Sequence, residues 1–365
     1  MLAHLSVLLA LGTLSLTGPT LSRAEPDTHA GSHAHGSAGK PAAAPQPTKE
    51  APRTEASKKS AVPAPAGFTP PEERDIPNNE FGETVRFGKL IFTNTQQYAK
   101  AHVGNGLNCA NCHLDRGRRA DSAPLWAAYV LYPAYRKKTG KIDTLQSRIQ
   151  GCFDYSMNGS SPAIDSKEMT ALVSYHYWLA RNAPTGVKLK GQGFVKLPPP
   201  DKTPDLARGK QTYKNNCAIC HGDDGHGTKA QGQYAFPPLW GPDSFNWGAG
   251  MHRIDTAAGF IKVNMPYGRF GTLSDQEAWD VALYMNSHDR PKDPRFKHSL
   301  EKTRDEHHDE NCLYGRTPAE LAARLAKSKK PAAASADKEK KPAAADAPAA
   351  GEVPRWDGYS PATAH

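Results

Sequence analysis

Two copies of one short pattern contain the residues best suited to chemistry. In each copy, two cysteines flank two other residues and a histidine follows directly, at Cys109, Cys112 and His113 and again at Cys217, Cys220 and His221. Thiols at this spacing add to the two vinyl groups of a haem, and the adjacent histidine then lies under the iron. A zinc site would need a second pair of ligands near each box, and the sequence offers none. The boxes therefore predict two covalently bound haem c groups.

Each iron needs a ligand on its other face. For the second haem, the stretch KVNMPYGRF supplies Met265, followed by a proline and a glycine that favour an extended turn. Met251 and Met285 are the alternatives, and Met285 lies on an expected helix where it would pack in the core. A thioether ligand raises the reduction potential of a haem, which suits a relay centre. We therefore expect His221 and Met265 to ligate the second iron.

The first haem has two candidate ligands, Cys152 and Met157, in the stretch RIQGCFDYSMNG. A thiolate lowers the potential of the iron, which is the opposite of the effect of methionine. Cys152 has a further interpretation, because a disulfide with Cys312 is plausible in an oxidising compartment. Cys312 lies outside both repeats, whereas Cys152 stands where an axial ligand belongs. Spacing alone leaves Cys152 and Met157 nearly equal.

A helix is expected before each box, and it carries a glycine four positions before an aromatic residue. These pairs are Gly88 with Phe92 and Gly209 with Tyr213. The missing side chain lets this helix cross closely over the last helix of the same repeat. The aromatic pairs expected at the two crossings are Phe92 with Tyr177 or Trp178, and Tyr213 with Tyr284.

A capped helix is expected to end each repeat. Asp165 with Glu168 opens the first of these helices and Ser274 with Glu277 opens the second, because a capping side chain with glutamate three positions later marks a helix start. Each repeat therefore consists of a helix, a box, a long irregular loop and a capped helix. The pattern predicts an all-α protein with two cytochrome c-like helical domains in tandem.

Composition divides the rest of the chain. A leucine-rich run followed by a Gly-Pro break and small residues predicts a cleaved signal peptide, and no other segment is apolar enough to anchor in a membrane. Both ends are rich in Ala, Pro and Lys, which predicts disordered extensions. The expected order is signal peptide 1–24, low-complexity leader 25–70, first cytochrome c domain 71–190, linker 191–204, second cytochrome c domain 205–292, C-terminal extension 293–325 and low-complexity tail 326–365.

The formal net charge of +9 favours acidic partners in general. Much of this charge lies in the lysine-rich tails, so we interpret it as solvated linker and expect no nucleic-acid partner. The histidines of THAGSHAHG, in the leader, are interpreted as an exposed run that binds metal weakly at most.

The chain resembles the dihaem, tetrathionate-forming thiosulfate dehydrogenases. The resemblance covers about residues 80–290 and is carried by GNGLNCANCHLDRGR, LQSRIQGCFDYSMNG, DSKEMTALVSYHYWLA and the loop around Met265. It implies His113 and Cys152 as the axial ligands of a catalytic haem in the first domain. It also implies His221 and Met265 as the ligands of an electron-transfer haem in the second.

The same resemblance implies a substrate site. Arg148 and Ser156 fall four positions before and four positions after Cys152, as in the family, and Arg136 corresponds to a further family arginine. An arginine near a haem also commonly binds a propionate, which is the alternative role for Arg148.

Two positions depart from the family pattern. Some members have a lysine directly before the second-haem methionine and exchange the two ligands, but this chain has Asn264. Asp154 and Tyr155 stand where a basic residue is expected after the cysteine, which predicts a less cationic substrate pocket.

The resemblance implies oxidation of two thiosulfate ions to tetrathionate in the periplasm, with transfer of electrons to an external cytochrome or similar carrier. The same enzyme can run in reverse as a tetrathionate reductase. One alternative is a dihaem electron-transfer cytochrome without a substrate of its own. Another is a sulfur-carrier enzyme in which a haem-bound cysteine accepts a sulfur group from a partner subunit.

Overall fold

The computed structural model describes residues 67–309 and 311–328. The predicted signal peptide 1–24, the leader as far as residue 66 and the tail from residue 329 lie outside the described residues. All described residues belong to one compact unit.

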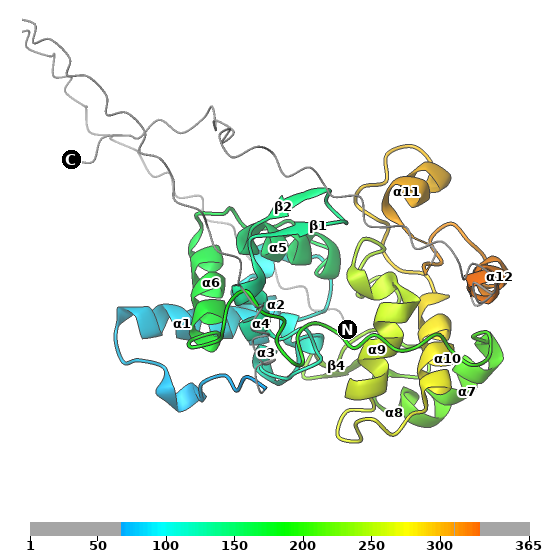
Figure 1. Ribbon diagram of the computed structural model, residues 1–365, viewed down its shortest axis with the longest axis horizontal. Coiled ribbons are helices and arrows are strands. Elements are labelled where there is room, and N and C mark those ends of the chain that lie inside the picture. Colours follow the sequence, from blue (N-terminus) through cyan, green and yellow to red (C-terminus); the bar gives the residue numbers. More distant parts are fainter. Residues whose placement is uncertain (1–66, 310, 329–365) are drawn as a thin grey trace, which may run out of the picture. The chain divides into compact units, whose positions relative to one another are not determined.

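The first half of the described chain is a group of helices around the first box, coloured blue to green in Figure 1. Asn79 begins the first long helix because its side chain accepts a hydrogen bond from the backbone N–H of Gly82. The elements of this half are η1 (Glu73–Asp75), α1 (Glu80–Thr93), α2 (Thr95–Tyr98), η2 (Lys100–His102), η3 (Cys109–Asn111), α3 (Leu114–Gly117), α4 (Leu125–Leu131), β1 (Ala134–Arg136), β2 (Lys141–Asp143), α5 (Leu145–Gly151), η4 (Cys152–Ser156) and α6 (Lys167–Leu179).

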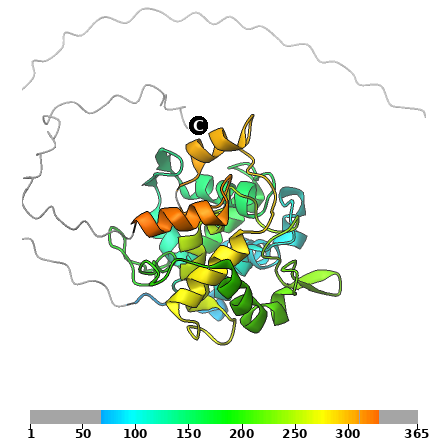
Figure 2. The same cartoon turned by 90° about the vertical axis from the view of Figure 1, so that its right-hand side faces the viewer.

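The second half repeats the arrangement around the second box. Asp205 caps its first helix through a hydrogen bond from the backbone N–H of Arg208. The elements are α7 (Leu206–Asn216), α8 (Ala218–His221), β3 (Thr228–Ala230), β4 (Gln233–Phe236), η5 (Gly250–His252), α9 (Ile254–Asn264) and α10 (Asp275–Asn286). Two further helices follow, coloured orange in Figure 2, α11 (Leu300–His307) and α12 (Pro318–Ser328).

The first and last helices of each half cross at a glycine, as the sequence predicts. A Cβ atom added at Gly88 of α1 would lie 2.0 Å from the carbonyl oxygen of Ala171 in α6, and one added at Gly209 of α7 would lie 2.2 Å from that of Asp280 in α10. Both distances are far below van der Waals contact. No larger residue fits at either crossing without moving a backbone.

The aromatic residues at the crossings are partly as expected. Tyr213 packs against Tyr284 with ring centroids 5.6 Å apart. Phe92 faces Tyr175 at 5.9 Å, so the prediction of Tyr177 or Trp178 was wrong. Tyr175 is fully buried on the inner face of α6, and Tyr177, two positions further along the helix, is exposed.

Of the two predicted caps of the last helices, one is confirmed and one is wrong. Ser274 and Glu277 form the expected capping box at the start of α10. In α6 the capping side chain is Ser166, which accepts the N–H of Met169, so the prediction of Asp165 was wrong by one position.

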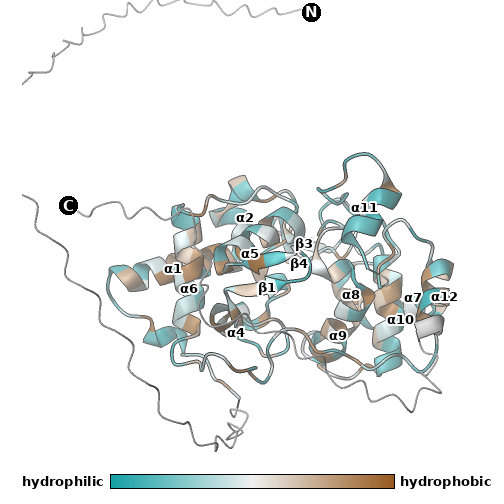
Figure 3. Cartoon of the chain, turned by 45° about the horizontal axis from the view of Figure 1, so that its top comes forward, coloured by the Kyte–Doolittle hydropathy of each residue, from teal (hydrophilic) through white to brown (hydrophobic). Residues whose placement is uncertain are grey.

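The described chain is mainly helical, and its strands form two small hairpins that the sequence did not predict. In one, β1 pairs antiparallel with β2, and in the other β3 pairs antiparallel with β4. Figure 3 shows hydrophobic stretches on α4 and α9, whose apolar side chains lie in the buried core. Within the described ranges, none of the helices is long and apolar enough to cross a bilayer.

Candidate active site at a pair of haem-attachment boxes

The two box histidines are oriented in the same way. His113 Nδ1 lies 2.7 Å from the carbonyl oxygen of Ala123, and His221 Nδ1 lies 2.8 Å from that of Pro237. A carbonyl oxygen only accepts hydrogen bonds, so each Nδ1 carries the proton and each Nε2 keeps its lone pair. This is the form that ligates iron, and the hydrogen bond fixes the ring orientation. Both boxes therefore fit haem attachment with the histidine as a ligand.

Cys152 lies at the end of α5, beside the first box. Arg148, one helical turn earlier, donates a hydrogen bond from Nη1 to Cys152 Sγ at 2.8 Å. His113 is a further neighbour of this thiol. Burial by itself would raise the pKa of this thiol, but the Arg148 guanidinium on the preceding turn holds it below its usual range. Arg148 therefore favours the thiolate form of Cys152, which is the form that binds a metal.

The box cysteines differ from Cys152 in this respect. Burial raises the pKa of Cys109 to about 12 and that of Cys112 to about 11, and both thiols feel the nearby charge of Cys152. The first box and Cys152 therefore form one cluster of sulfur atoms. Within it, only Cys152 has a cationic partner that favours the thiolate.

The surroundings of Cys152 differ from those of Cys312 and Met157. Cys152 and Cys312 are both free cysteines with different partners, so the disulfide interpretation was wrong. Met157 is only 2% exposed and belongs to the hydrophobic core. The geometry favours Cys152 over Met157 as the group that faces His113.

The turn that starts at Cys152 is a π-helix, η4. The N–H of Met157 donates to the carbonyl oxygen of Cys152 at 2.9 Å, which is the wide hydrogen bond of a π-turn. Such turns are rare and often occur at functional sites. Ser156 ends this turn and is half-buried, one position before Met157.

Two asparagines hold the carbonyl groups of this π-turn. Asn105 donates to the carbonyl of Ser156 at 2.8 Å and to that of Ser244 at 3.1 Å. Asn246, from the second half of the chain, donates to the carbonyl of Asp154 at 2.9 Å. These contacts fix the turn that carries Cys152. Sequence reasoning assigned no role to Asn105, although it lies in the stretch GNGLNCANCHLDRGR, and it missed Asn246, which belongs to no motif.

The hairpin between α4 and α5 brings further cations to the site. Arg136 Nη1 lies 3.8 Å from the buried carboxylate of Asp143, which holds the arginine in place. Lys138 donates from Nζ to the carbonyl of Gly248 at 2.6 Å and lies 4.1 Å from the ring centroid of Tyr155.

The cations of this region lie close enough to affect one another. Lys138 is exposed as a residue, but its amino group lies against Gly248 and Tyr155, and this partial loss of water lowers its pKa. The charges of Arg295, Arg148 and Arg136 lower it further. Arg295 also lies over the ring of Tyr155, at 5.1 Å. Lys138 and Arg295 thus lie beside Tyr155, in the turn that follows Cys152. The sequence pattern of the turn between β1 and β2 does not indicate that Lys138 lies beside Tyr155.

Met265 follows directly after α9 and is partly buried against the core. Met285 lies buried on α10, as expected for a core residue, and Met251 lies in η5.

The residue before Met265 links the two halves of the chain. Asn264 is fully buried, accepts a hydrogen bond from Arg119 Nε at 2.8 Å and donates to the carbonyl of Asp121 at 3.1 Å. The carbonyl that holds His113 belongs to Ala123, two positions after Asp121. Hydrogen bonds of Asn264 therefore connect the segment of Met265 to the loop whose Ala123 carbonyl orients His113.

The fold and the boxes define a class, the dihaem c-type cytochromes. Residues 94–185 match the family described as SoxA/TsdA, cytochrome c domain, and residues 204–285 match that described as Cytochrome C oxidase, cbb3-type, subunit III. These matches, with the repeated helices, confirm two cytochrome c domains in tandem and two haem groups.

Similar proteins narrow the class. The chain is 58% identical over 251 residues to a thiosulfate dehydrogenase of Stutzerimonas stutzeri, a match that covers 68% of this chain and 82% of the relative. It is 51% identical over 257 residues to one of Thiomonas intermedia, covering 70% of this chain and 82% of the relative. The chain belongs to the thiosulfate dehydrogenase family.

A solved structure agrees with this assignment. The thiosulfate dehydrogenase TsdBA of Marichromatium purpuratum superposes with a TM-score of 0.67 at 50% sequence identity. The match covers 68% of this chain and 55% of that chain, so this chain spans about half the length of the solved protein.

Replacing Asn264 tests the link between the halves. Asn264→Leu should lower the free energy of unfolding by about 1–3 kcal/mol, because the Arg119 side chain and the Asp121 carbonyl lose buried partners. Urea denaturation followed by circular dichroism measures this change. The control Asn215→Leu, at an exposed position of α7, should change it by no more than about 0.5 kcal/mol. Equal effects of the two substitutions would contradict the link.

Proposed function

We propose that the protein oxidises two thiosulfate ions to one tetrathionate ion and two electrons at the first box, and delivers the electrons to an external carrier. The observation that carries this proposal is the Cys152 thiolate, which lies beside His113 and accepts a hydrogen bond from Arg148. An electron-transfer haem would not need a thiolate or a cluster of cations around it.

The proposed ligands follow from this arrangement. His113 and Cys152 would hold the iron of the first haem, attached through Cys109 and Cys112. His221 and Met265 would hold the iron of the second, attached through Cys217 and Cys220. When bound, the two haem groups supply two one-electron centres, which match the two electrons released for each tetrathionate.

The substrate explains the need for several cations. Two thiosulfate dianions about 5 Å apart repel one another by roughly 3 kcal/mol even in water. Arg148 presents a planar guanidinium that matches the sulfonate oxygens. Arg136 adds positive charge, Lys138 adds more in its protonated form, and the hydroxyl of Ser156 is a further donor. These residues would bind the two anions and offset their repulsion.

The direction of the reaction depends on the acceptor. A catalyst does not fix direction, so the same site would reduce tetrathionate when the carrier has a sufficiently low potential. We propose an external cytochrome or similar carrier as the acceptor. We also propose export to the periplasm, because covalent haem attachment at such boxes takes place outside the cytoplasm.

An assay of purified holoprotein with thiosulfate and ferricyanide tests the proposed function. We expect one tetrathionate for every two ferricyanide ions reduced, without any added carrier protein. Arg148→Gln should raise the KM for thiosulfate by about tenfold or more, because the anion loses a cationic partner. It should also lower kcat, because the Cys152 thiolate loses its hydrogen-bond donor.

Covalent haem content should stay unchanged in Arg148→Gln. Loss of haem with an unchanged KM would instead support a propionate-binding role for Arg148. No oxidation of thiosulfate by the wild-type protein would support the electron-transfer cytochrome, and activity only with a partner protein would support the sulfur carrier.

A substitution of Lys138 distinguishes an effect on substrate binding from an effect on the haem. Lys138→Gln should raise the KM for thiosulfate several-fold, on the order of 1 kcal/mol, and leave the spectra of both haems unchanged, because Lys138 does not contact Cys152. Lys137→Gln, at the exposed neighbouring position, is the matched control and should leave the KM unchanged. A KM that responds equally to the two substitutions would exclude a local role for Lys138.

A further inference from the structure

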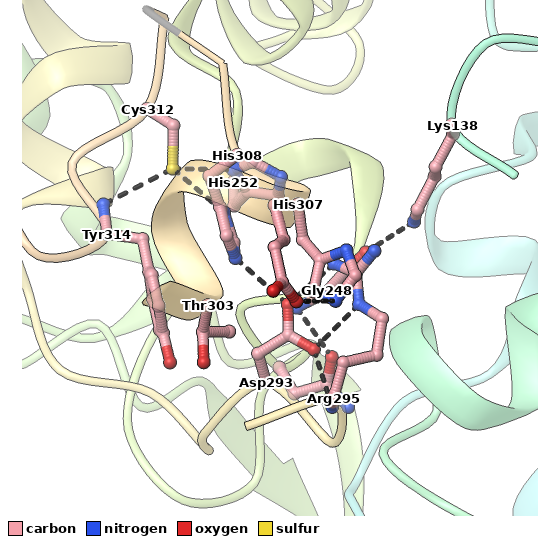
Figure 4. Close-up of polar contacts among 12 residues, drawn as sticks. Lys138, Gly248, His252, Asp293, Arg295, Thr303, His307, His308, Cys312 and Tyr314 are labelled. Atoms are coloured by element: carbon pink, nitrogen blue, oxygen red, sulfur yellow. Dashed lines mark hydrogen bonds and ion pairs between the residues drawn. The ribbon is translucent and has the colours of Figure 1, made fainter. Parts of the chain in front are cut away.

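Three buried side chains outside the haem boxes meet at one point. His252 ends η5, His308 directly follows α11, and Cys312 lies four positions further along (Figure 4). His252 Nδ1 lies 2.9 Å from Cys312 Sγ and His308 Nδ1 lies 3.3 Å from it. Cys312 has no exposed surface, and the two histidines are 5% and 7% exposed. The proposed thiosulfate chemistry uses none of the three.

The hydrogen bonds of His308 direct a lone pair toward this point. Its Nε2 lies 2.9 Å from the carboxylate of Asp293, and a carboxylate accepts, so Nε2 carries the proton. Nδ1 is then the unprotonated nitrogen, and it faces the sulfur of Cys312. Metal-bound histidines commonly donate their other N–H to a carboxylate in this way.

The carboxylate of Asp293 is itself held in position. Arg295 donates to both of its oxygens, from Nε to Oδ1 at 2.9 Å and from Nη2 to Oδ2 at 2.6 Å. The sulfur of Cys312 also accepts the backbone N–H of Tyr314 at 3.2 Å. In metal sites, hydrogen bonds to the ligand atoms and to the groups behind them fix the orientation of the ligands.

We propose that His252, His308 and Cys312 bind one thiophilic transition-metal ion, copper or zinc. Among the described residues, these form a group in which one ligand atom from each lies within 4.8 Å of the others. One thiolate and two imidazoles suit zinc and copper, whereas magnesium and calcium prefer oxygen ligands. Three protein ligands match the trigonal site of copper, or a zinc site completed by a further ligand.

The metal would fasten the C-terminal segment to the second cytochrome domain. His308 and Cys312 belong to that segment, and His252 lies just before α9, the helix that leads to Met265. The backbone already pairs here, because the N–H of Ile254 donates to the carbonyl of Asn311 at 2.9 Å. A metal bond would lock this pairing.

The same metal would act on the proposed substrate site through Arg295. This arginine binds Asp293, the partner of His308, and its guanidinium lies over Tyr155 in the π-turn that carries Cys152. This consequence rests on the proposed function, but the metal site itself does not.

Element analysis of the full-length holoprotein tests the proposal. We expect about one copper or zinc ion per chain beyond the two haem irons, and about none in Cys312→Ser. His298→Gln, at an exposed position of the same segment, is the control and should keep the metal. The wild-type protein and Cys312→Ser both contain the histidines at 29–35, so metal bound by those histidines cancels in the comparison.

X-ray absorption of the wild-type protein needs no variant, so it tests the proposal even if Cys312→Ser fails to fold. At the copper or zinc edge we expect one sulfur at about 2.3 Å and two nitrogens at about 2.0 Å. The edge that gives the signal identifies the metal. Wild-type protein that neither contains nor takes up copper or zinc would overturn the proposal, as would metal held equally by Cys312→Ser or bound without sulfur.

Discussion

The contact between the Arg148 guanidinium and the Cys152 sulfur is the interaction on which the rest of the site depends. A buried thiol is normally protonated, and burial raises the pKa of the neighbouring Cys109 and Cys112. Cys152 differs because the Arg148 guanidinium lowers its pKa. One arginine on the preceding turn therefore favours a thiolate in a position where the haem of the first box would need a ligand.

That contact requires a turn of unusual geometry, and the second domain supports it. Placing Cys152 at the start of a π-turn leaves carbonyl groups that need partners, and Asn105 and Asn246 supply them. Asn264 makes a second connection, between the segment of Met265 and the loop that orients His113. The two cytochrome domains thus share hydrogen bonds that position the residues proposed as haem ligands.

The sequence predicted the parts of this arrangement that are local. The boxes, the glycine crossings and the cap at Ser274 follow from spacing along a helix. The sequence predicted Tyr177 or Trp178 where the structure has Tyr175, and Asp165 where it has Ser166. The pattern of a short amphipathic helix does not define which residue faces inward or where the helix begins to better than a few positions. Lys138, Asn246 and the cluster around Cys312 were not predicted, because each depends on contacts between segments far apart in the chain, which spacing does not encode.

Electron paramagnetic resonance of the oxidised holoprotein tests the central claim, that Cys152 ligates the first haem as a thiolate. The account predicts two low-spin ferric signals, one narrow and of thiolate type and one broader and of histidine–methionine type. Cys152→Met should convert the narrow signal to the second type and raise the potential of that haem, because a thioether no longer stabilises the ferric state. A wild-type spectrum without the narrow signal, or the same spectrum in Cys152→Met, would contradict it.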